Sequence, residues 1–530
     1  MAPDTIADPE TDASATYAVE PSTARRLTSR VVCAPRPQWR TMTSPMTGAP
    51  IASLPLSTPA DVAVAVCAAR AAQRGWARTP LEVRSAIMLR LHDLVLERQV
   101  EILDLVQLEA GKARAHAFEE VADTAICARH YARSAAAYLR PQRHAGAFPL
   151  LSQSVELLHP KGVVGVISPW NYPFSLAITD LIPALLAGNA VVLRPDLQTA
   201  LTALKGVELL AEAGLPEGVL QVVLGDGESV GQAVVETTDY VCYTGSTATG
   251  RLVAQAAAKR LVGVSLELGG KNSLYVRADA NLGKAVAGAV RSAFASAGQL
   301  CMHTERLILH EQIADEFLER FVVAVRAMRL GPELAYGIDM GSLLSPGQLE
   351  RTVAHVEDAR SKGACVLVGG RARPDLGPYF YEPTVLAGVT AAMDCRDEET
   401  FGPVVSVYRV ASDDEAVRLA NDSDYGLNAS IFTRDVRRGR AIARRIRAGT
   451  VNINDGYAAA WASTAAPMGG MKDSGLGRRH GAEGIRKYTE SQNVTAQHLV
   501  GFAPALGLSD EQWTRGLTLA LVAMRKLGRS

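Results

Sequence analysis

The chain has 530 residues, of which 48% are hydrophobic and 21% charged, so we expect a globular protein of two or three domains. Its 55 basic and 55 acidic residues balance, which argues against a protein that binds nucleic acid or a membrane surface through charge. The seven cysteines form no CxxC pair and no zinc-type spacing, so we expect neither a disulfide framework nor a metal site.

The first 30 residues are rich in Ala, Asp, Thr and Pro without periodicity, which predicts a disordered lead over 1–30. This segment lacks the charged-then-apolar order of a secretion signal, so we expect a reducing, cytoplasmic location. Helical patterns dominate between residues 60 and 139. The stretch 140–160 has no helical period and contains two prolines, and we interpret it as an extended arm.

From residue 163 onward, short apolar runs alternate with helical patterns, as in VVGVI, AVVL, LQVVL and YVCY. A second series follows from residue 281 to TVNI at 450. Such alternation is typical of parallel sheets covered on both faces. The sequence therefore predicts two α/β domains, and domains of this kind commonly bind a ligand in the cleft between them.

Two glycine-rich turns follow strands in the first series. In YVCYTGSTATG, a strand runs into Gly245 and Ser246 and then into a helix, whose first N–H groups suit a pyrophosphate. GDGESVG, which contains Gly225, is the second turn, although it misses the usual dinucleotide spacing by one residue. Each alone is as well interpreted as a plain tight turn, but the two together favour nucleotide binding.

Four further residues carry candidate chemistry. Glu267 in LELGGKN ends an apolar strand, where burial would suit a general base, although a turn-capping carboxylate is the alternative. Asn171 in ISPWNYPF has an amide suited to an oxyanion, or is an ordinary turn residue. Glu399 precedes a rigid Phe-Gly-Pro turn and suits ribose hydroxyls. Cys301 lies among small, polar residues that are unusual around a core cysteine.

The combination resembles the aldehyde dehydrogenase superfamily. The similarity runs from about residue 35 to residue 498, through PWNYP, GNAVVLRP, YTGSTATG, LELGGKN, GQLC, ETFGPV and PMGGMKDSGLGR. It implies that Cys301 is the nucleophile, that Glu267 is the general base, and that Asn171 and the Cys301 backbone N–H hold the oxyanion. An aldehyde would be oxidised through a thiohemiacetal and a thioester, with hydride transfer to NAD(P) and without a metal.

The resemblance also implies the organisation of the protomer. The expected parts are a Rossmann-like cofactor-binding domain (31–139 and 161–266), a catalytic domain (267–487), an oligomerisation arm (140–160 and 488–498) and a C-terminal extension (499–530). A homodimer or homotetramer is expected. The implied cofactor contacts are Ser168, Pro169, Trp170, Arg194, Asp196, Leu197, Gly225, Gly245, Ser246, Leu268, Glu399 and Phe401. The implied substrate contacts are Trp170, Phe174, Tyr457 and Trp461.

For the cofactor, we expect NADP to be used at least as well as NAD. NAD-selective members of the family often have a glutamate at the position of Leu197, which would repel a 2′-phosphate. Arg194 would pair with that phosphate in a fork, although Asp196 nearby works against it.

Within the family, KGVVGVISPWNYPF and RRHGAEGIRKYTESQ are similar to NADP-dependent succinate-semialdehyde dehydrogenases of actinobacteria. The positions that supply substrate-binding arginines in better-known enzymes of this activity are Thr179 and Ala295 here, and a second cysteine is replaced by His303. Succinic semialdehyde is therefore the expected substrate, with weak recognition of its carboxylate. A broad-specificity aldehyde dehydrogenase, acyl transfer to coenzyme A and a non-catalytic relative remain alternatives.

The C-terminal extension contains an amphipathic helical pattern, with Trp513, Leu517, Leu521 and Met524 on one stripe. Its apolar run is too short to cross a bilayer. We expect the helix to dock on the protein's own surface, and an interfacial membrane anchor is the alternative.

Overall fold

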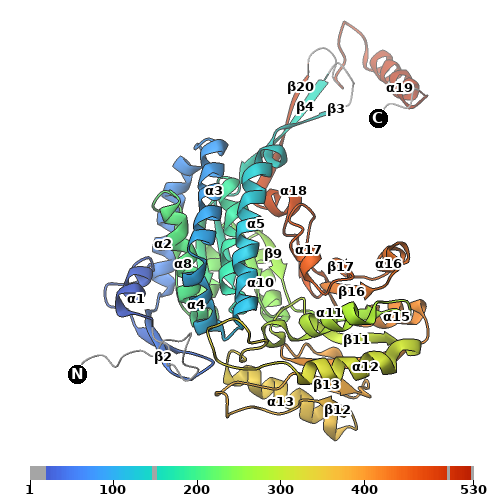
Figure 1. Ribbon diagram of the computed structural model, residues 1–530. Helices are drawn as coiled ribbons and strands as arrows, with labels where there is room; N and C mark the ends of the chain where they lie inside the picture. The colour runs from blue at the N-terminus through green and yellow to red at the C-terminus, as the bar shows by residue number, and fades with distance from the viewer. Residues whose placement is uncertain (1–18, 146–151, 498–501, 527–530) are drawn as a thin grey trace.

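The computed structural model describes residues 19–145, 152–497 and 502–526. Two β-sheets covered by helices form the body, and a thin arm extends away from it (Figure 1). The first sheet has the order β19-β9-β8-β5-β6-β7, and the second has the order β12-β13-β14-β11-β10-β16-β17. The predicted fold class, two doubly wound α/β units and a β arm, is confirmed.

The first sheet has five parallel strands, and the short β19 pairs with β9 in the antiparallel sense. The bounds are β5 Val163–Ser168, β6 Ala190–Pro195, β7 Leu220–Val222, β8 Tyr240–Thr244, β9 Gly263–Glu267 and β19 Gly475–Leu476. Strands β5 and β8 are neighbours, with the chain winding outward in both directions from them. Ligands of such sheets bind beyond the carboxyl ends of the strands at this switch point.

Helices pack around the first sheet and share one core with it. Their bounds are α2 Pro59–Trp76, α3 Leu81–Glu97, α4 Gln99–Ala110, α5 Arg114–Leu139, α6 Pro173–Ile178, α7 Leu181–Leu186, α8 Ala200–Glu212, α9 Gln232–Thr237 and α10 Thr247–Lys259. A separate hairpin is formed by β1 Trp39–Thr43 and β2 Pro50–Pro55. The strands of the first sheet are largely apolar because helices bury both of its faces.

The lead predicted to be disordered over 1–30 is partly helical. Pro21–Thr28 form α1, which starts at a proline and buries Leu27 against α8. Arg26 of α1 also pairs with Glu208 of α8. The prediction was wrong for this stretch because one buried leucine and one ion pair fix a short helix that has no periodicity of its own. Residues 1–18 lie outside the described residues.

The second sheet is parallel except for its edge strand β12. Its bounds are β10 Asn272–Val276, β11 Thr304–His310, β12 Cys365–Val368, β13 Thr384–Ala387, β14 Val404–Val410, β16 Asn428–Phe432 and β17 Thr450–Ile453. Side chains alternate between two cores: Leu274 and Val276 enter one, and Tyr275 enters the other.

The helices of the second unit cover both faces of this sheet. They are α11 Leu282–Phe294, α12 Glu311–Arg326, α13 Pro346–Ser361, α14 Asp394–Asp397, α15 Asp413–Asn421, α16 Val436–Ala443 and α17 Ala458–Trp461. The later helix α18, Gly481–Arg486, packs instead against α5 and α7 of the first unit. A two-residue ladder joins β15 Tyr425–Gly426 to β18 Met471–Lys472. The chain then returns to the first unit, because β19 joins the sheet that contains β9.

The arm is a three-stranded antiparallel sheet of β3 Gln142–Ala145, β4 Ser152–Pro160 and β20 Thr489–Gln497. The register joins Thr489 to Pro160 and Gln497 to Ser152. The segments expected to form an arm, 140–160 and 488–498, thus supply its strands.

The last helix, α19 Asp510–Lys526, lies beyond the end of the arm and away from the body (Figure 1). Trp513 is its buried residue, and its indole N–H donates to the Phe502 carbonyl at 3.2 Å. Leu519 and Leu521 are more than half exposed. The expected docking on the protein's own surface is therefore not observed, because the arm carries this helix out of reach of the body. Within the described ranges, no helix is long and apolar enough to span a membrane.

Candidate active site

Cys301 follows a strained turn at the end of α11. The turn η3, Ala295–Gly298, contains two non-glycine residues with positive φ, Ser296 at 51° and Ala297 at 54°. A Cβ on Gly298 would lie 2.0 Å from the Gly402 carbonyl oxygen. Residues held in this conformation cost energy and cluster at functional sites. Here the strain turns the chain sharply, so that the half-buried Cys301 faces two cavities.

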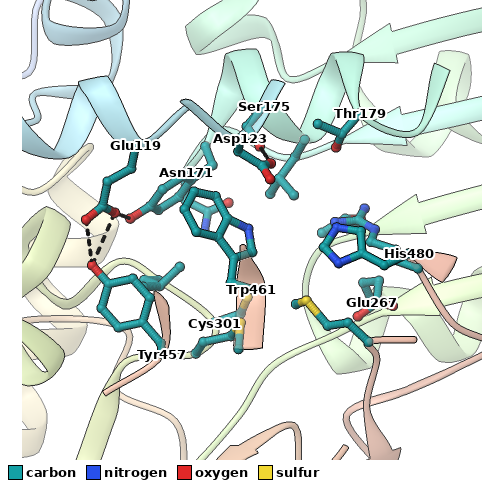
Figure 2. Close-up of a pocket in the computed structure, with 17 residues that line it drawn as sticks. Glu119, Asp123, Asn171, Ser175, Thr179, Glu267, Cys301, Tyr457, Trp461 and His480 are labelled. Atoms are coloured by element: carbon teal, nitrogen blue, oxygen red, sulfur yellow. Dashed lines mark hydrogen bonds between the residues drawn. The ribbon is translucent and has the colours of Figure 1, made fainter. Parts of the chain in front are cut away.

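The two cavities meet at four residues that line both: Asn171, Thr244, Glu267 and Cys301. We call one the inner pocket, which is also lined by Glu119, Asp123, Tyr457, Trp461, Arg479 and His480 (Figure 2). We call the other the outer cleft, which is also lined by Trp170, Gly245, Ser246, Leu268, Glu399 and Phe401. A thiol, a carboxyl and an amide therefore lie where one ligand in each cavity would meet.

Asn171 lies between β5 and α6 and is buried. The next turn is held by Glu120 of α5, which accepts from the backbone N–H groups of Phe174 at 2.7 Å and Ser175 at 3.1 Å. Lys112 pairs with the same carboxylate at 2.5 Å. This buried ion pair fixes the start of α6 and with it the loop that carries Asn171.

Glu267 is the last residue of β9, opposite Thr244 on β8 and Gly475 on β19. Burial raises the pKa of its carboxyl to about 7, although the positive charges of Arg479 and Lys487 oppose that rise. A carboxyl that titrates near neutrality is well matched to accept and return protons. This environment distinguishes Glu267 from a turn-capping carboxylate.

The Cys301 thiol is protonated at neutral pH in this environment. Burial and the neighbouring carboxylates of Glu267 and Glu399 raise its pKa to about 12. Because the thiolate is the nucleophile, the thiol must lose its proton when it attacks. Glu267 lines both cavities together with this thiol, and its pKa of about 7 lets it accept the proton.

The outer cleft has the features of a dinucleotide site. Gly245 directly follows β8, and Ser246 caps the 13-residue helix α10 by accepting from the Thr249 N–H at 3.3 Å. A Cβ on Gly245 would lie 2.3 Å from the Tyr243 hydroxyl, so the backbone here is open only because the residue is glycine. Free N–H groups at a helix N-terminus bind phosphate oxygens. The turn at Gly245-Ser246 and the start of α10 therefore fit a pyrophosphate.

The other wall of the outer cleft carries Glu399 and Phe401. Glu399 accepts from the Gly270 N–H at 2.7 Å, and a Cβ on Gly269 would lie 2.4 Å from its carboxylate. Phe401 has φ of +53° and packs edge-on against Trp170, with 5.4 Å between ring centroids.

A buried ion pair that the sequence analysis missed lies beneath this wall. Glu305 on β11 accepts from the N–H groups of Thr400 and Phe401 at 3.0 Å and pairs with Lys271. Both charged side chains are almost completely inaccessible to solvent. The pair holds the loop that presents Glu399, and only the pairing of β10 with β11 brings its two members together.

Several predicted contacts have other positions. The Nε and Nη2 of Arg194 both donate to the Gly225 carbonyl, at 3.0 and 2.6 Å, so the expected fork for a phosphate is already used. Asp196 caps the short turn that begins with the buried Leu197. Ser168 has a buried hydroxyl without a hydrogen-bond partner among the described residues. Pro169 lines the outer cleft.

Two predicted substrate contacts lie elsewhere. Phe174 is fully buried in the core of the first unit, where Gly206 leaves room for its ring, and Leu176 of the same helix lines the inner pocket instead. Trp170 lines the outer cleft and not the inner pocket. A six-residue helix gives too little pattern to predict which side faces a cavity.

Tyr457 and Trp461 line the inner pocket, as does Thr179, whereas Ala295 is buried beside it. The Tyr457 hydroxyl donates to Glu119 at 2.9 Å, and Tyr172 donates to the same carboxylate at 3.1 Å (Figure 2). The sequence analysis missed Glu119, Asp123, Arg479 and His480. Arg479 brings into the pocket a cation that Thr179 and Ala295 do not supply.

A family model described as "Aldehyde dehydrogenase family" matches residues 35–494. A protein of Mycolicibacterium smegmatis named "Putative succinate-semialdehyde dehydrogenase [NADP(+)]" is 51% identical over 490 residues, which cover 92% of this chain and 95% of that one.

Solved structures show the same similarity. The crystal structure of succinate-semialdehyde dehydrogenase from Burkholderia pseudomallei has a TM-score of 0.83 and 34% identity, with 87% of this chain and 95% of that one covered. The NAD+ complex of an aldehyde dehydrogenase from Bacillus cereus has a TM-score of 0.83 and 33% identity, with 87% and 93% covered.

Proposed function

This chain belongs to the aldehyde dehydrogenase family, and from that premise we propose that it oxidises an aldehyde to a carboxylic acid through a covalent intermediate on Cys301. The observation that carries the proposal is the meeting of Cys301, Glu267 and Asn171 at the boundary of the two cavities. An aldehyde in the inner pocket and a dinucleotide in the outer cleft would both reach that boundary.

In the first half of the reaction, the Cys301 sulfur forms a bond to the aldehyde carbon as the thiol proton passes to Glu267. The electrons of the carbonyl double bond move to the oxygen, and the Asn171 amide and the Cys301 backbone N–H stabilise that oxyanion. Oxidation of this thiohemiacetal leaves a thioester on Cys301.

In the second half, Glu267 has released the thiol proton to solvent, and its carboxylate takes a proton from water as the water oxygen attacks the thioester carbon. The carbon–sulfur bond breaks, the acid leaves, and the thiol regains a proton. Because the pKa of Glu267 lies at about 7, its carboxylate accepts a proton from water and releases it to solvent near neutral pH.

We propose a nicotinamide dinucleotide as the cofactor, NADP with NAD as the alternative. When bound, it supplies the acceptor for the hydrogen and electron pair removed from the aldehyde carbon. Gly245, Ser246 and the start of α10 would hold the pyrophosphate, and Glu399 would accept from ribose hydroxyls. Leu197 provides no carboxylate to repel a 2′-phosphate, and the M. smegmatis relative is named for NADP.

Succinic semialdehyde is the proposed substrate, since two of the similar proteins are named for it. A broad-specificity aldehyde dehydrogenase is the second candidate, favoured by the apolar wall of Leu176, Leu300 and Trp461. We also propose a homodimer or homotetramer assembled through the arm, because its three strands have almost no buried face and a sheet of this size needs one for stability. A reducing compartment such as the cytoplasm suits a chain whose seven cysteines are all free.

A panel of aldehydes with NAD and NADP, followed as reduced cofactor, tests the proposal. Oxidation of at least one short aldehyde, with the acid as product, is expected. Added coenzyme A should yield no acyl-CoA, because Glu267 directs water to the thioester. Absence of oxidation across the panel would refute the proposed activity and leave a non-catalytic relative.

A further inference from the structure

Arg479 places a fixed cation in the inner pocket. It follows β19, and its buried side chain lines the pocket together with Cys301. Its Nη2 donates to the Thr244 hydroxyl at 2.6 Å and pairs with Asp180. Because Thr244 lies opposite Glu267 in the sheet, this guanidinium is held beside the reacting groups.

Three buried polar atoms of this pocket have no hydrogen-bond partner among the described residues. They are Nε of Arg479, Nδ1 of His480 and Oδ1 of Asp123. Each of the three side chains is more than nine-tenths buried, and each residue lines the same pocket. Figure 2 shows Asp123 and Thr179 along one wall and His480 on the next. Since unpaired buried polar groups are costly, their concentration here indicates a polar ligand.

The charges around these atoms favour an anion. Asp180 is shared by two cations, Arg479 and, at 3.6 Å, Lys487, so this group of three has one positive charge in excess. His480 is neutral near pH 7, since burial and Arg479 lower the pKa of its imidazole to about 4. An ammonium group would meet that excess positive charge, whereas a carboxylate would be stabilised by it.

Three acids line the pocket, Glu119, Asp123 and Glu267, and they do not cancel this preference. Burial raises the pKa of Glu267 to about 7, so near neutrality a large fraction of its carboxyl groups is neutral. Burial raises the pKa of Asp123 to about 7, so near neutrality a large fraction of its carboxyl groups is neutral and can donate a hydrogen bond. Glu119 is already compensated by the hydroxyls of Tyr172 and Tyr457 and by Arg291 at 2.8 Å.

Resting on the proposed function, we propose that Arg479, with His480 and Asp123, binds the distal carboxylate of a short ω-oxo acid whose aldehyde carbon lies at Cys301. A guanidinium Nε–H and a neutral imidazole N–H both donate to carboxylate oxygens. The site thereby takes the role that arginines at Thr179 and Ala295 would have filled. Succinic semialdehyde has a carboxylate at the end opposite its aldehyde group, as this arrangement requires.

The test compares kcat/KM for succinic semialdehyde with that for butanal, which has the same number of carbons and no charge. The wild-type protein should favour the semialdehyde at least about thirtyfold, and Arg479→Met should reduce that ratio by at least about tenfold. Arg479→Lys should retain part of the ratio. Arg478→Met is the matched control, because Arg478 donates to backbone carbonyls outside the pocket, and its ratio should equal that of the wild type.

The ratio separates substrate recognition from any effect of Arg479 on Glu267, which would change both aldehydes alike. Equal losses for both substrates in Arg479→Met would overturn the proposal. A wild-type preference for 4-aminobutanal would also overturn it, by showing that Asp123 dominates. Wild-type oxidation of no aldehyde would overturn the proposed function itself.

Removing Arg479 leaves Asp180 with one cation and can impair folding, so a second measurement uses the unmodified protein. Succinate and butyrate are compared as inhibitors of butanal oxidation by the wild-type protein. Succinate should inhibit at a concentration at least about tenfold lower, because only succinate has a second carboxylate for Arg479. Equal inhibition by the two acids would overturn the proposal whatever the variant does.

Discussion

The side-chain amide of Asn171 donates to the backbone carbonyl of Gln299 at 3.1 Å, across 128 residues of sequence. One N–H of the Asn171 amide is thus bonded to the loop that leads to Cys301. Because the amide group is planar, this bond also fixes the direction of the second N–H, which is free to donate to an oxyanion. Asn171→Ala should lower kcat by about 10²- to 10³-fold, the usual loss for one oxyanion donor. Dinucleotide affinity, measured by fluorescence titration, should change by less than about threefold. A fall in kcat below fivefold would exclude the role.

Cys301→Ala should abolish aldehyde oxidation while dinucleotide binding persists, because the covalent adduct is the species that is oxidised. Turnover is measured as reduced cofactor, with binding as the test of folding. Cys395→Ala is a suitable control, since Cys395 is buried in the second core and lines neither cavity. Residual activity above a few per cent of wild type is incompatible with the assignment.

Glu267→Gln should slow thioester hydrolysis more than thioester formation. Stopped-flow measurements should show a burst of reduced cofactor followed by little turnover. In the wild type, kcat should rise with pH through about 7, because the carboxylate form is the base and the pKa of Glu267 lies there. A variant that loses neither turnover nor this pH dependence would place the base elsewhere.

The sequence predicted the features that depend on local pattern. Buried strands are largely apolar runs, and Gly245-Ser246 directly follows one of them. Both the sheet and the turn proposed to bind phosphate could therefore be predicted from the sequence. The side of a short helix that faces the pocket could not be predicted from the sequence. Phe174 enters the core and Leu176 lines the pocket, although both lie in the same six-residue helix.

Contacts between residues far apart in the sequence account for the remaining differences between the predicted and the observed site. Arg479 reaches the pocket only because β19 returns to β9, and Asp180, its partner, lies 299 residues earlier. Arg194 was expected to be free, yet a carbonyl from the neighbouring turn occupies it. Neither relationship leaves a periodic or compositional signal in the chain.

Leu197→Glu should change the cofactor preference. We expect the wild type to use NADP at least as well as NAD, since Leu197 presents no charge to a 2′-phosphate. A glutamate there would repel the phosphate and accept ribose hydroxyls, so kcat/KM for NADP relative to NAD should fall by at least about tenfold. Leu197→Gln, which has similar size without charge, is the control. A wild-type kcat/KM for NAD more than tenfold above that for NADP would contradict the expectation.

Glu305→Gln should destabilise the protein most at neutral and alkaline pH. Burial favours the neutral form of Glu305, but the cation of Lys271 and the neighbouring His303 hold the pKa of its carboxyl well below its usual range. A carboxyl whose pKa is lowered stabilises the folded state above the unfolded value of 4.5, and that contribution is lost as pH falls below it. Breaking this buried pair should cost about 3–5 kcal/mol at pH 8, measured as a lower thermal midpoint. The loss should be nearly as large at pH 5, which lies above the unfolded pKa, and smaller by about 1 kcal/mol at about pH 3.5. A loss that is the same at pH 8 and at pH 3.5 would contradict the ionic origin.

Glu267→Gln should have the opposite effect on stability. Burial raises the pKa of Glu267 from 4.5 to about 7, so the folded state binds the proton more tightly than the unfolded chain does. Stability contributed by this group is fully present below pH 4.5 and is lost as pH rises to about 7, at about 3 kcal/mol in total. Glutamine stays neutral, so the variant should unfold at a higher temperature than the wild type at pH 8 and at nearly the same temperature at pH 5. Glu305→Gln makes the same chemical change at another buried carboxyl. If the two variants shift the thermal midpoint in opposite directions at pH 8, the environment of each residue is the cause of its shift. A lower midpoint for Glu267→Gln at pH 8 would mean that Arg479 and Lys487 stabilise the carboxylate more than burial destabilises it.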